Sequence, residues 1–550
     1  MGGKMQDGIF FLGNAKIFSM EPASIDHPHT VARSAVRFLS GTFLSRVAGL
    51  ARDMSMAFIF GTSAPIAAFL VAFRLANLLR RIFGEGALLN SFIPHFESHR
   101  ERDLGQGARF FRDTFFSLSA ALVLIVALIE MGLYLWANSP NISAENIQIL
   151  QLMMIILPGV IFICLFSLTS GLLQCEKAFF LTGISPIAFN GVWIGSIWFL
   201  RNQVPEKAVI GLSIGITLAF LAQWLLVLPK AISILRPFFS VKELLRCRFF
   251  PPEIRAMAFS LSAGVIGVMA AQINTALDTV FARFASLEGP AYLNYAIHIQ
   301  QLPLALFGIA VSSALLPPLS RSIRSNQLEH YKVLLEYCLN VAFFIVIPCA
   351  LGIFVAGGAC INLIFGRGEF NSFSTYQTTL CLWGYGLGLI PMVASLLLAP
   401  AFYARKEYRV PMVGALLSIG INMALNILLI WGFSMGPASL AVATSLAAYF
   451  NAIFLYKKLG VTLSPRFLRT SIQTLGCALL AGAITLSVGS IFLHDPTLSI
   501  CLGEGGEFIR GFRAQIFHFT LLFFTFSLSF FFFARLLKSE PFAQVLKLRE

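Results

Sequence analysis

The sequence carries little charge for its length. Of its 550 residues only 12% are Asp, Glu, Lys or Arg and 57% are hydrophobic, whereas a soluble domain is about 25% charged. This deficit excludes an ordinary soluble domain and indicates a polytopic membrane protein. The net charge of +14 would suggest nucleic acid in a soluble protein. Here the bases lie in short loops between apolar runs, so we expect no nucleic-acid partner.

The sequence also lacks paired cysteines, catalytic motifs and a cleavable signal. Its nine cysteines are scattered singly, so we expect buried free thiols and no metal site. No P-loop, H-E-x-x-H or nucleophile-elbow motif is present, which argues against an enzyme. The apolar patch from Ile9 to Leu12 is too short for a signal peptide. We therefore predict that residues 1–33 are a cytoplasmic tail.

Long apolar runs of the kind that cross a membrane fill most of the chain. A span needs about 20 mostly apolar residues, and we predict an all-α protein with fourteen transmembrane helices. The first two are the least hydrophobic because of the charges they carry. The candidates lie at residues 35–60, 64–84, 114–137, 148–173, 182–200, 208–235, 256–284, 291–317, 334–357, 376–402, 411–433, 438–456, 468–493 and 514–536.

The distribution of bases between the loops predicts the orientation. The loops after even-numbered spans are rich in Lys and Arg, whereas the loops at 61–64 and 138–145 have none. Excess Lys and Arg marks the cytoplasmic side. We therefore expect both termini to face the cytoplasm.

One internal repeat links spans 2 and 8. The segment Ala72–Leu78 aligns without a gap with Ala296–Leu302, and Arg74 then falls opposite His298. The two spans are six helices apart, so the copies run in the same direction, as parallel repeats. This predicts two parallel six-helix lobes plus two C-terminal helices. We predict a cytoplasmic tail at residues 1–33, an N-lobe at 34–240 and a C-lobe at 241–465. Residues 466–550 hold the last two spans and a cytoplasmic C-terminal tail.

Spans 1 and 2 carry seven charges where a span should be apolar. Each charge at the bilayer centre costs on the order of 2.5–3.5 kcal/mol on insertion scales. Some of the arginines could pair with the acids or reach the membrane interface, serving only structure. Bases outnumber acids, however, so pairing cannot neutralise the set, and surplus guanidinium groups suit pyrophosphate or carboxylate oxygens. The seven residues are Arg46, Arg52, Asp53, Arg74, Arg80, Arg81 and Glu85.

Two further titratable residues lie inside the C-lobe spans. Asp278 and Arg283 are five residues apart, and we favour a structural ion pair between them over a sodium or proton site at Asp278. His298 is either a hydrogen-bonded core histidine or, as the counterpart of Arg74, a residue that lines the cavity.

Two blocks of the sequence closely resemble the MurJ (MviN) lipid II flippases. They run from Ser45 to Asp53 and from Phe69 to Ala87. The resemblance extends over about residues 34–537 and implies the fold of the multidrug/oligosaccharidyl-lipid/polysaccharide exporter superfamily, in which the last two helices form a groove for the lipid tail. Shorter matches are Leu315–Ser320, Phe365–Phe370 and Ala399–Arg405.

The resemblance implies a transporter, not an enzyme, in the bacterial inner membrane. It would move lipid II, an undecaprenyl-pyrophosphate-linked disaccharide-pentapeptide, to the outer leaflet for peptidoglycan synthesis by alternating access. Expected partners are lipid II, membrane lipid and the peptidoglycan synthesis machinery. No cofactor is implied; the membrane potential would drive transport, and Na⁺ or H⁺ coupling through Asp278 stays open.

The resemblance also assigns roles to individual residues. The family's essential cavity arginines match Arg46, Arg52 and Arg80, and we expect Arg74, Arg81 and His298 to join them in binding the substrate. Asp53 and Glu85 match motif acids and are predicted to form gating ion pairs. The family's C-lobe cavity arginine falls on His298, whose charge depends on pH.

Several alternatives remain open at this stage. The chain could move another polyprenyl-linked oligosaccharide, or export drugs coupled to a cation, although a drug exporter more often uses acids for cationic cargo. A membrane glycosyltransferase would normally show clustered acids for a metal. The fourth alternative is a scaffold protein that binds lipid II without moving it.

Overall fold

A computed structural model describes residues 28–83, 87–140, 142–240, 243, 246–304, 310–493, 497 and 508–537. Every regular element in this part of the chain is helical. The helices of the first half are α1 (Pro28–Phe60), α2 (Ala64–Phe83), α3 (Ala87–Arg102), α4 (Leu104–Ala137), α5 (Ala144–Cys175), α6 (Phe179–Ile184), α7 (Pro186–Phe199), α8 (Pro205–Leu235) and η1 (Arg236–Phe238). Those of the second half are α10 (Pro252–Ala285), α11 (Gly289–Pro303), α12 (Ala310–Arg324), α13 (Leu328–Phe365), α14 (Ser372–Ala404), α15 (Arg409–Ile427), η3 (Leu428–Gly432), α16 (Ala438–Leu459), α17 (Pro465–Val488), η4 (Gly489–Leu493) and α19 (Phe512–Leu536).

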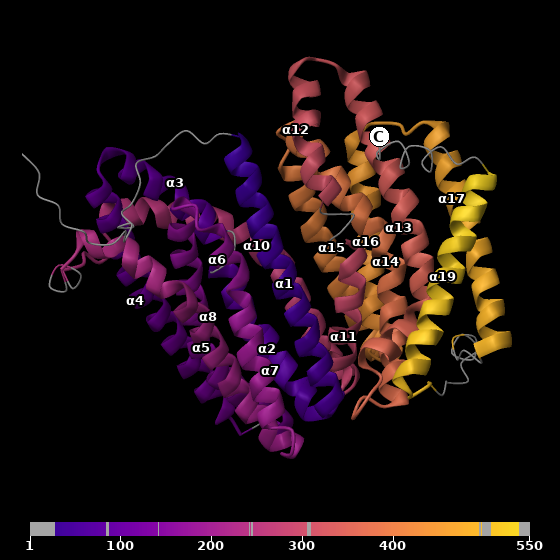
Figure 1. The fold of residues 1–550 in the computed structure, drawn as a ribbon, viewed down its shortest axis with the longest axis horizontal. Helices are drawn as coiled ribbons and strands as arrows, with labels where there is room; N and C mark the ends of the chain where they lie inside the picture. Colours follow the sequence, from indigo (N-terminus) through magenta and orange to yellow (C-terminus); the bar gives the residue numbers. More distant parts are fainter. Residues whose placement is uncertain are drawn as a thin grey trace, which may run out of the picture.

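The helices form two bundles that meet at one end and diverge at the other (Figure 1). Helices α1 to α8 make up the first bundle, and α11 to α19 the second. Helix α10 runs between them and packs against α2 and α3 of the first bundle and α15 of the second. Helices α17 and α19 pack on each other and on α13 at the outer side of the second bundle (Figure 1).

Within the described residues, helices of the structure overlap each of the fourteen predicted spans, and the number of membrane crossings stays a prediction. In the described part of the chain, ten helical segments are long and apolar enough to cross a membrane. The other four predicted spans lie in α1, α2, α10 and the pair α11–α12. In α1 and α2 the apolar pattern is interrupted by the charged residues that the sequence singles out.

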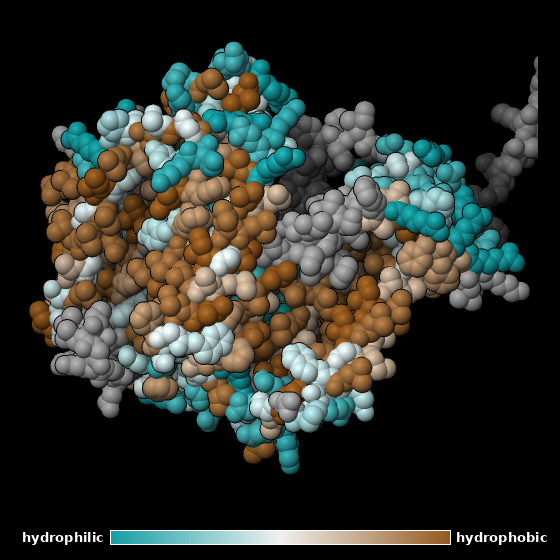
Figure 2. Space-filling model, turned by 180° about the vertical axis from the view of Figure 1, so that it is seen from behind, coloured by the Kyte–Doolittle hydropathy of each residue, from teal (hydrophilic) through white to brown (hydrophobic). Residues whose placement is uncertain are grey.

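The outer surface carries the apolar side chains expected of a membrane protein. Figure 2 shows a wide belt of hydrophobic residues around the middle of the molecule, with hydrophilic residues gathered at its two ends. Leu128 of α4 and Phe532 of α19 are 65% and 62% exposed. Such an apolar belt between polar ends matches the hydrocarbon layer of a bilayer, so the chain is a multi-pass membrane protein.

Helix α3 was not expected from hydropathy. It is too short and too polar for a span, but Leu88, Phe92 and Phe96 recur every fourth residue and are fully buried. The Phe92 ring packs 6.0 Å from the rings of Phe110 and Phe111 in α4. This apolar stripe at helical spacing, rather than overall hydrophobicity, is the signal that predicts such a helix.

Candidate functional site

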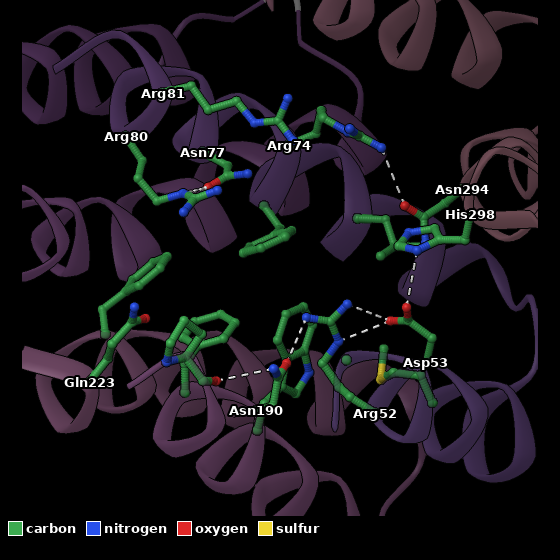
Figure 3. Close-up of a pocket in the computed structure, with 18 of the residues that line it drawn as sticks. Arg52, Asp53, Arg74, Asn77, Arg80, Arg81, Asn190, Gln223, Asn294 and His298 are labelled. Atoms are coloured by element: carbon green, nitrogen blue, oxygen red, sulfur yellow. Dashed lines mark hydrogen bonds and ion pairs between the residues drawn. The ribbon is translucent and has the colours of Figure 1, made fainter. Parts of the chain in front are cut away.

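A cavity of about 300 Å³ lies between the two bundles, and most of the charged residues noted in the first two predicted spans line it (Figure 3). Its walls come from α1, α2, α7, α8 and α11. Four arginines and one carboxylate line it, so the cavity is strongly positive even with a neutral histidine. Its charged residues and its histidine are Arg52, Asp53, Arg74, Arg80, Arg81 and His298.

The helical period of α2 explains why so many polar groups face the cavity. Leu70, Arg74, Asn77 and Arg81 follow one another at steps of three or four residues and all line it, as one face of a helix should. The opposite face is apolar, and its residues Ala68 and Ala72 are fully buried. Helix α2 can therefore lie in an apolar bundle and still present guanidinium groups to the cavity.

Arg52 is held by residues of α1 and α7 (Figure 3). Its Nε and Nη2 donate to Oδ1 of Asp53 at 2.9 and 2.7 Å, and its Nη1 donates to Oδ1 of Asn190 at 3.1 Å. Its Cζ lies 4.3 Å from the centre of the Trp193 ring, which is cation–π geometry. Asn190 in turn donates to the backbone oxygen of Ser45 in α1. Helix α7 therefore fixes both α1 and the guanidinium group of Arg52.

Three cavity residues of the first bundle each contact a residue of α10 or α11 (Figure 3). Oδ2 of Asp53 lies 3.2 Å from Nδ1 of His298. Arg74 donates from Nη2 to Oδ1 of Asn294 at 3.3 Å. The third contact runs from Nη1 of Arg81 to Oε1 of Gln272 at 2.8 Å. The two halves of the molecule therefore meet through polar side chains inside the cavity, not through apolar packing alone.

Of the remaining predicted site residues, Arg80 lines the cavity and Arg46 does not. Arg46 is exposed and does not line the cavity in this conformation, so its role in binding stays a prediction. Glu85 lies outside the described residues. Arg80 lines the cavity and donates to Asn77.

Several cavity residues carry no charge and were not predicted from the sequence. Asn190, Trp193, Gln223 and Asn294 all line the cavity. The signal was present, because side-chain amides are rare in apolar spans and usually face a polar interior.

A smaller pocket of about 80 Å³ surrounds Asp278 beside the main cavity. Asp278 is buried and accepts hydrogen bonds from Asn422 at 2.7 Å, Asn426 at 2.8 Å and Thr444 at 3.2 Å. Leu70, Arg74 and Asn294 line both pockets, so one arginine faces both sites.

The predicted ion pair between Asp278 and Arg283 is wrong. Five residues along a helix rotate a side chain by about 140°, so the two point to different faces. Arg283 instead donates to the backbone oxygens of Ala64 and Leu287 and lies 3.8 Å from a carboxylate oxygen of Glu145.

The cavity is closed at the end where the two bundles meet. The backbone N–H of Glu369 donates to the oxygen of Phe58 at 3.0 Å, and the hydroxyls of Thr62 and Ser374 lie 2.7 Å apart. The Tyr295 hydroxyl donates to the oxygen of Gly61 at 3.3 Å. These contacts join the α1–α2 turn to the second bundle and seal this end; we call them the closed-end contacts.

Comparison with known sequences gives matches over most of the chain. Residues 56–502 match the sequence profile of the family described as lipid II flippase MurJ. A probable lipid II flippase MurJ of Chlamydia muridarum is 32% identical over 493 residues, which cover 87% of this chain and 90% of the relative. The protein of that name in Vibrio cholerae is 28% identical over 493 residues, which cover 86% of this chain and 91% of the relative.

Solved structures support the same fold. A lipid II flippase MurJ in an inward closed conformation superposes with a TM-score of 0.71 at 22% identity, covering 91% of this chain and 99% of that one. A multidrug resistance MATE family transporter of the MOP superfamily, in its inward-facing conformation, gives a TM-score of 0.58 at 14% identity, covering 77% and 97%. The overall fold is therefore common to all three proteins.

Proposed function

This chain belongs to the MurJ family of lipid II flippases, and from that membership we propose that it moves lipid II across the bacterial inner membrane by holding the pyrophosphate in its arginine cavity. The observation that carries the mechanism is the composition of the cavity wall, with Arg52, Arg74, Arg80 and Arg81 against the single carboxylate of Asp53. Guanidinium forks bind phosphate oxygens in pairs. A positively charged cavity of this kind selects an anionic head group over the cationic cargo of a drug exporter.

Access to the cavity alternates between the two sides of the membrane. The closed-end contacts involve the turn at 61–64, and the absence of Lys and Arg from this turn favours the outer side. The diverging ends of the bundles and both termini then belong to the cytoplasmic side. The head group enters from the cytoplasm, the tail stays in lipid beside α17 and α19, and rocking of the bundles breaks the closed-end contacts to release the cargo outward.

The membrane potential favours this direction of transport. With the inside negative, each net negative charge moved outward gains about 2.3 kcal/mol per 100 mV. The emptied, positively charged cavity is drawn back by the same field. No cofactor is needed for this cycle.

Asp278 is the site through which Na⁺ or H⁺ couples to the cycle. Its neighbours Asn422 and Asn426 are buried, and Oδ1 of each lacks a hydrogen-bond partner within the described part of the chain. An amide that turns over presents this oxygen, and with the carboxylate and the Thr444 hydroxyl it makes an oxygen set suited to a hard cation. Arg74 faces both pockets, so an anion that attracts Arg74 leaves Asp278 freer to take a cation or proton.

The test is a complementation assay with a topological readout. A cell's own flippase is depleted, this chain is supplied, and lipid II is probed with an externally added toxin that cleaves its head group. We expect accessible lipid II with the intact chain and a large loss with Arg52→Ala or Arg80→Ala. Arg109→Ala, in a solvent-exposed pair with Asp103, is the matched control.

Two outcomes would contradict the proposal. Unchanged accessibility in the cavity variants would exclude the anion mechanism. If the intact chain never made lipid II accessible, it would not be a lipid II flippase, and other polyprenyl-linked oligosaccharides would be tested next. Association with the peptidoglycan synthesis machinery stays a prediction that co-purification from cells can test.

A further inference from the structure

One wall of the cavity has no residue that would bind the pyrophosphate through an opposite charge. Helices α7 and α8 contribute aromatic rings and amides to it but no charged side chain: Phe189, Asn190, Trp193, Phe220 and Gln223. In Figure 3 Gln223 and Asn190 lie along one side of the open space, and Arg80 and Asn77 lie across it. This α7–α8 wall is chemically unlike the arginine-rich face of α2.

Two polar groups on the α7–α8 wall have no partner within the described part of the chain. Gln223 is 5% exposed, and no hydrogen bond engages its side-chain amide. Trp193 is 2% exposed, and its Nε1 is buried without a hydrogen-bond acceptor. A buried polar group left unsatisfied costs about 1–3 kcal/mol, so the indole N–H of Trp193 indicates a missing hydrogen-bond partner. The Gln223 amide is not among the buried unsatisfied groups and lines the cavity, where a ligand can reach it.

The other cavity amides are already engaged. Asn190 accepts from Arg52 and donates to backbone oxygens, Asn294 accepts from Arg74, and Asn77 accepts from Arg80. These three orient arginines. Gln223 orients none, so its amide is available to a ligand.

The α7–α8 wall lies next to the anion site. The Cζ atom of Arg52 lies 4.3 Å from the centre of the Trp193 ring, so the α7–α8 wall is adjacent to the proposed pyrophosphate site. A group bonded directly to a pyrophosphate on Arg52 would reach the α7–α8 wall. An aromatic surface beside an amide and an indole N–H suits a sugar ring, whose C–H face packs on aromatic carbon while its hydroxyl and amide groups form hydrogen bonds.

We propose that Gln223 and Trp193 form a subsite for the first sugar of the head group, and that they make the protein prefer sugar-bearing over bare polyprenyl pyrophosphate. The proposal rests on the anion site described above and extends it to the uncharged part of the cargo. The arginines bind any polyprenyl pyrophosphate, and the α7–α8 wall distinguishes the loaded carrier from the empty one. Such discrimination prevents futile export of the carrier lipid.

The test compares two ligands that share one polyprenyl chain, the bare pyrophosphate and the pyrophosphate-linked sugar. Binding to the full-length purified protein is measured by native mass spectrometry. We expect the wild type to bind the sugar-bearing lipid at least about five-fold more tightly, the effect of one net hydrogen bond. Gln223→Leu and Trp193→Phe should each lower that ratio toward one, and Gln223→Leu should leave the affinity for the bare lipid within two-fold. Gln151→Leu, on the exposed side of α5, is the control and should keep the ratio.

Each alternative outcome is informative. If the wild type binds both lipids equally, or if neither variant changes the ratio, the sugar subsite is wrong. An equal loss of affinity for both lipids in Gln223→Leu would make Gln223 a structural or pyrophosphate-binding residue and overturn the proposal. If the wild type binds neither lipid better than Arg52→Ala does, the anion site itself fails. Trp193→Phe keeps the test valid if Gln223→Leu does not fold.

Discussion

Nδ1 of His298 lies 3.2 Å from Oδ2 of Asp53, so a ring of the second bundle meets a carboxylate of the first inside the cavity. The other oxygen of the same carboxylate accepts two hydrogen bonds from Arg52. Asp53 therefore lies between Arg52 and His298 and competes with any anion for these two groups. In the mechanism proposed above, cargo displaces this carboxylate when it binds, and the return of the carboxylate helps to expel the cargo.

This arrangement predicts opposite effects of Asp53→Asn on binding and on transport. The variant keeps the shape of the side chain and removes the negative charge that competes for Arg52. Since hydrogen bonds to charged groups contribute about 1.5–3 kcal/mol, we expect polyprenyl pyrophosphate to bind roughly ten-fold more tightly. Lipid II should become accessible to external toxin more slowly, because release is hindered. Asp103→Asn, in a solvent-exposed pair, should change neither quantity, and weaker binding in Asp53→Asn would refute the competition.

His298→Arg is expected to retain activity and to remove a pH dependence. A protonated imidazole adds positive charge to the cavity, whereas a neutral one does not, so wild-type activity should fall as pH rises. Arginine keeps its charge at every working pH, and the variant's profile should be flatter. Flipping rates in proteoliposomes over a pH series measure this. His330→Arg, at an exposed position of α13, serves as the control, and identical profiles for His298→Arg and the wild type would assign His298 a purely structural role.

The repeat in the sequence anticipates part of the cavity. It pairs Arg74 with His298, and both line the cavity, from α2 and α11. Charges inside spans are costly, so they are strong indicators of a polar interior even without a structure. The helical period alone was less reliable. Arg46 and Asp53 are seven residues apart and share a face, yet Asp53 is buried and Arg46 exposed, because seven residues also advance about 10.5 Å along the helix.

Contacts between distant parts of the chain could not be read from the sequence. The closed-end contacts join residues that are 234 positions apart for Gly61 and Tyr295 and 312 apart for Thr62 and Ser374. They depend on how the two bundles lean together. The neighbours of Asp278 likewise come from α15 and α16. Local spacing suggested Arg283 as its partner, whereas the partners are set by tertiary packing.

Asp278→Asn is expected to uncouple transport from cations without unfolding the protein. The asparagine is nearly isosteric and can still bond to Asn422, Asn426 and Thr444. It lacks the negative charge that attracts a cation, and it cannot take up a proton. Flipping by the wild type should depend on a Na⁺ or H⁺ gradient, and flipping by the variant should not. Reconstituted vesicles with imposed gradients give the measurement, and Glu130→Gln in α4, which lines neither pocket, should behave as wild type. A gradient dependence that persists in Asp278→Asn would exclude this residue as the coupling site.

Gly61→Ala should weaken the closed end, and Gly460→Ala provides a close control. Both glycines have positive φ, +60° and +66°, so alanine costs about 1–2 kcal/mol of backbone strain at either site. They differ in their surroundings. A Cβ at Gly61 would lie 2.5 Å from the backbone oxygen of Glu369, whereas one at Gly460 meets nothing within 4 Å.

The difference between the two glycine variants therefore isolates the contact across the closed end. Thr62→Cys with Ser374→Cys, whose wild-type hydroxyls are 2.7 Å apart, reports closure as disulfide formation in a background without the native cysteines. We expect efficient cross-linking with Gly460→Ala, and a several-fold lower yield with Gly61→Ala because the bundles separate there. The cross-link should also stop flipping until it is reduced, since the cargo must leave through this end. Equal yields in the two variants, or flipping that continues in the cross-linked protein, would show that opening of this end is not part of the transport cycle.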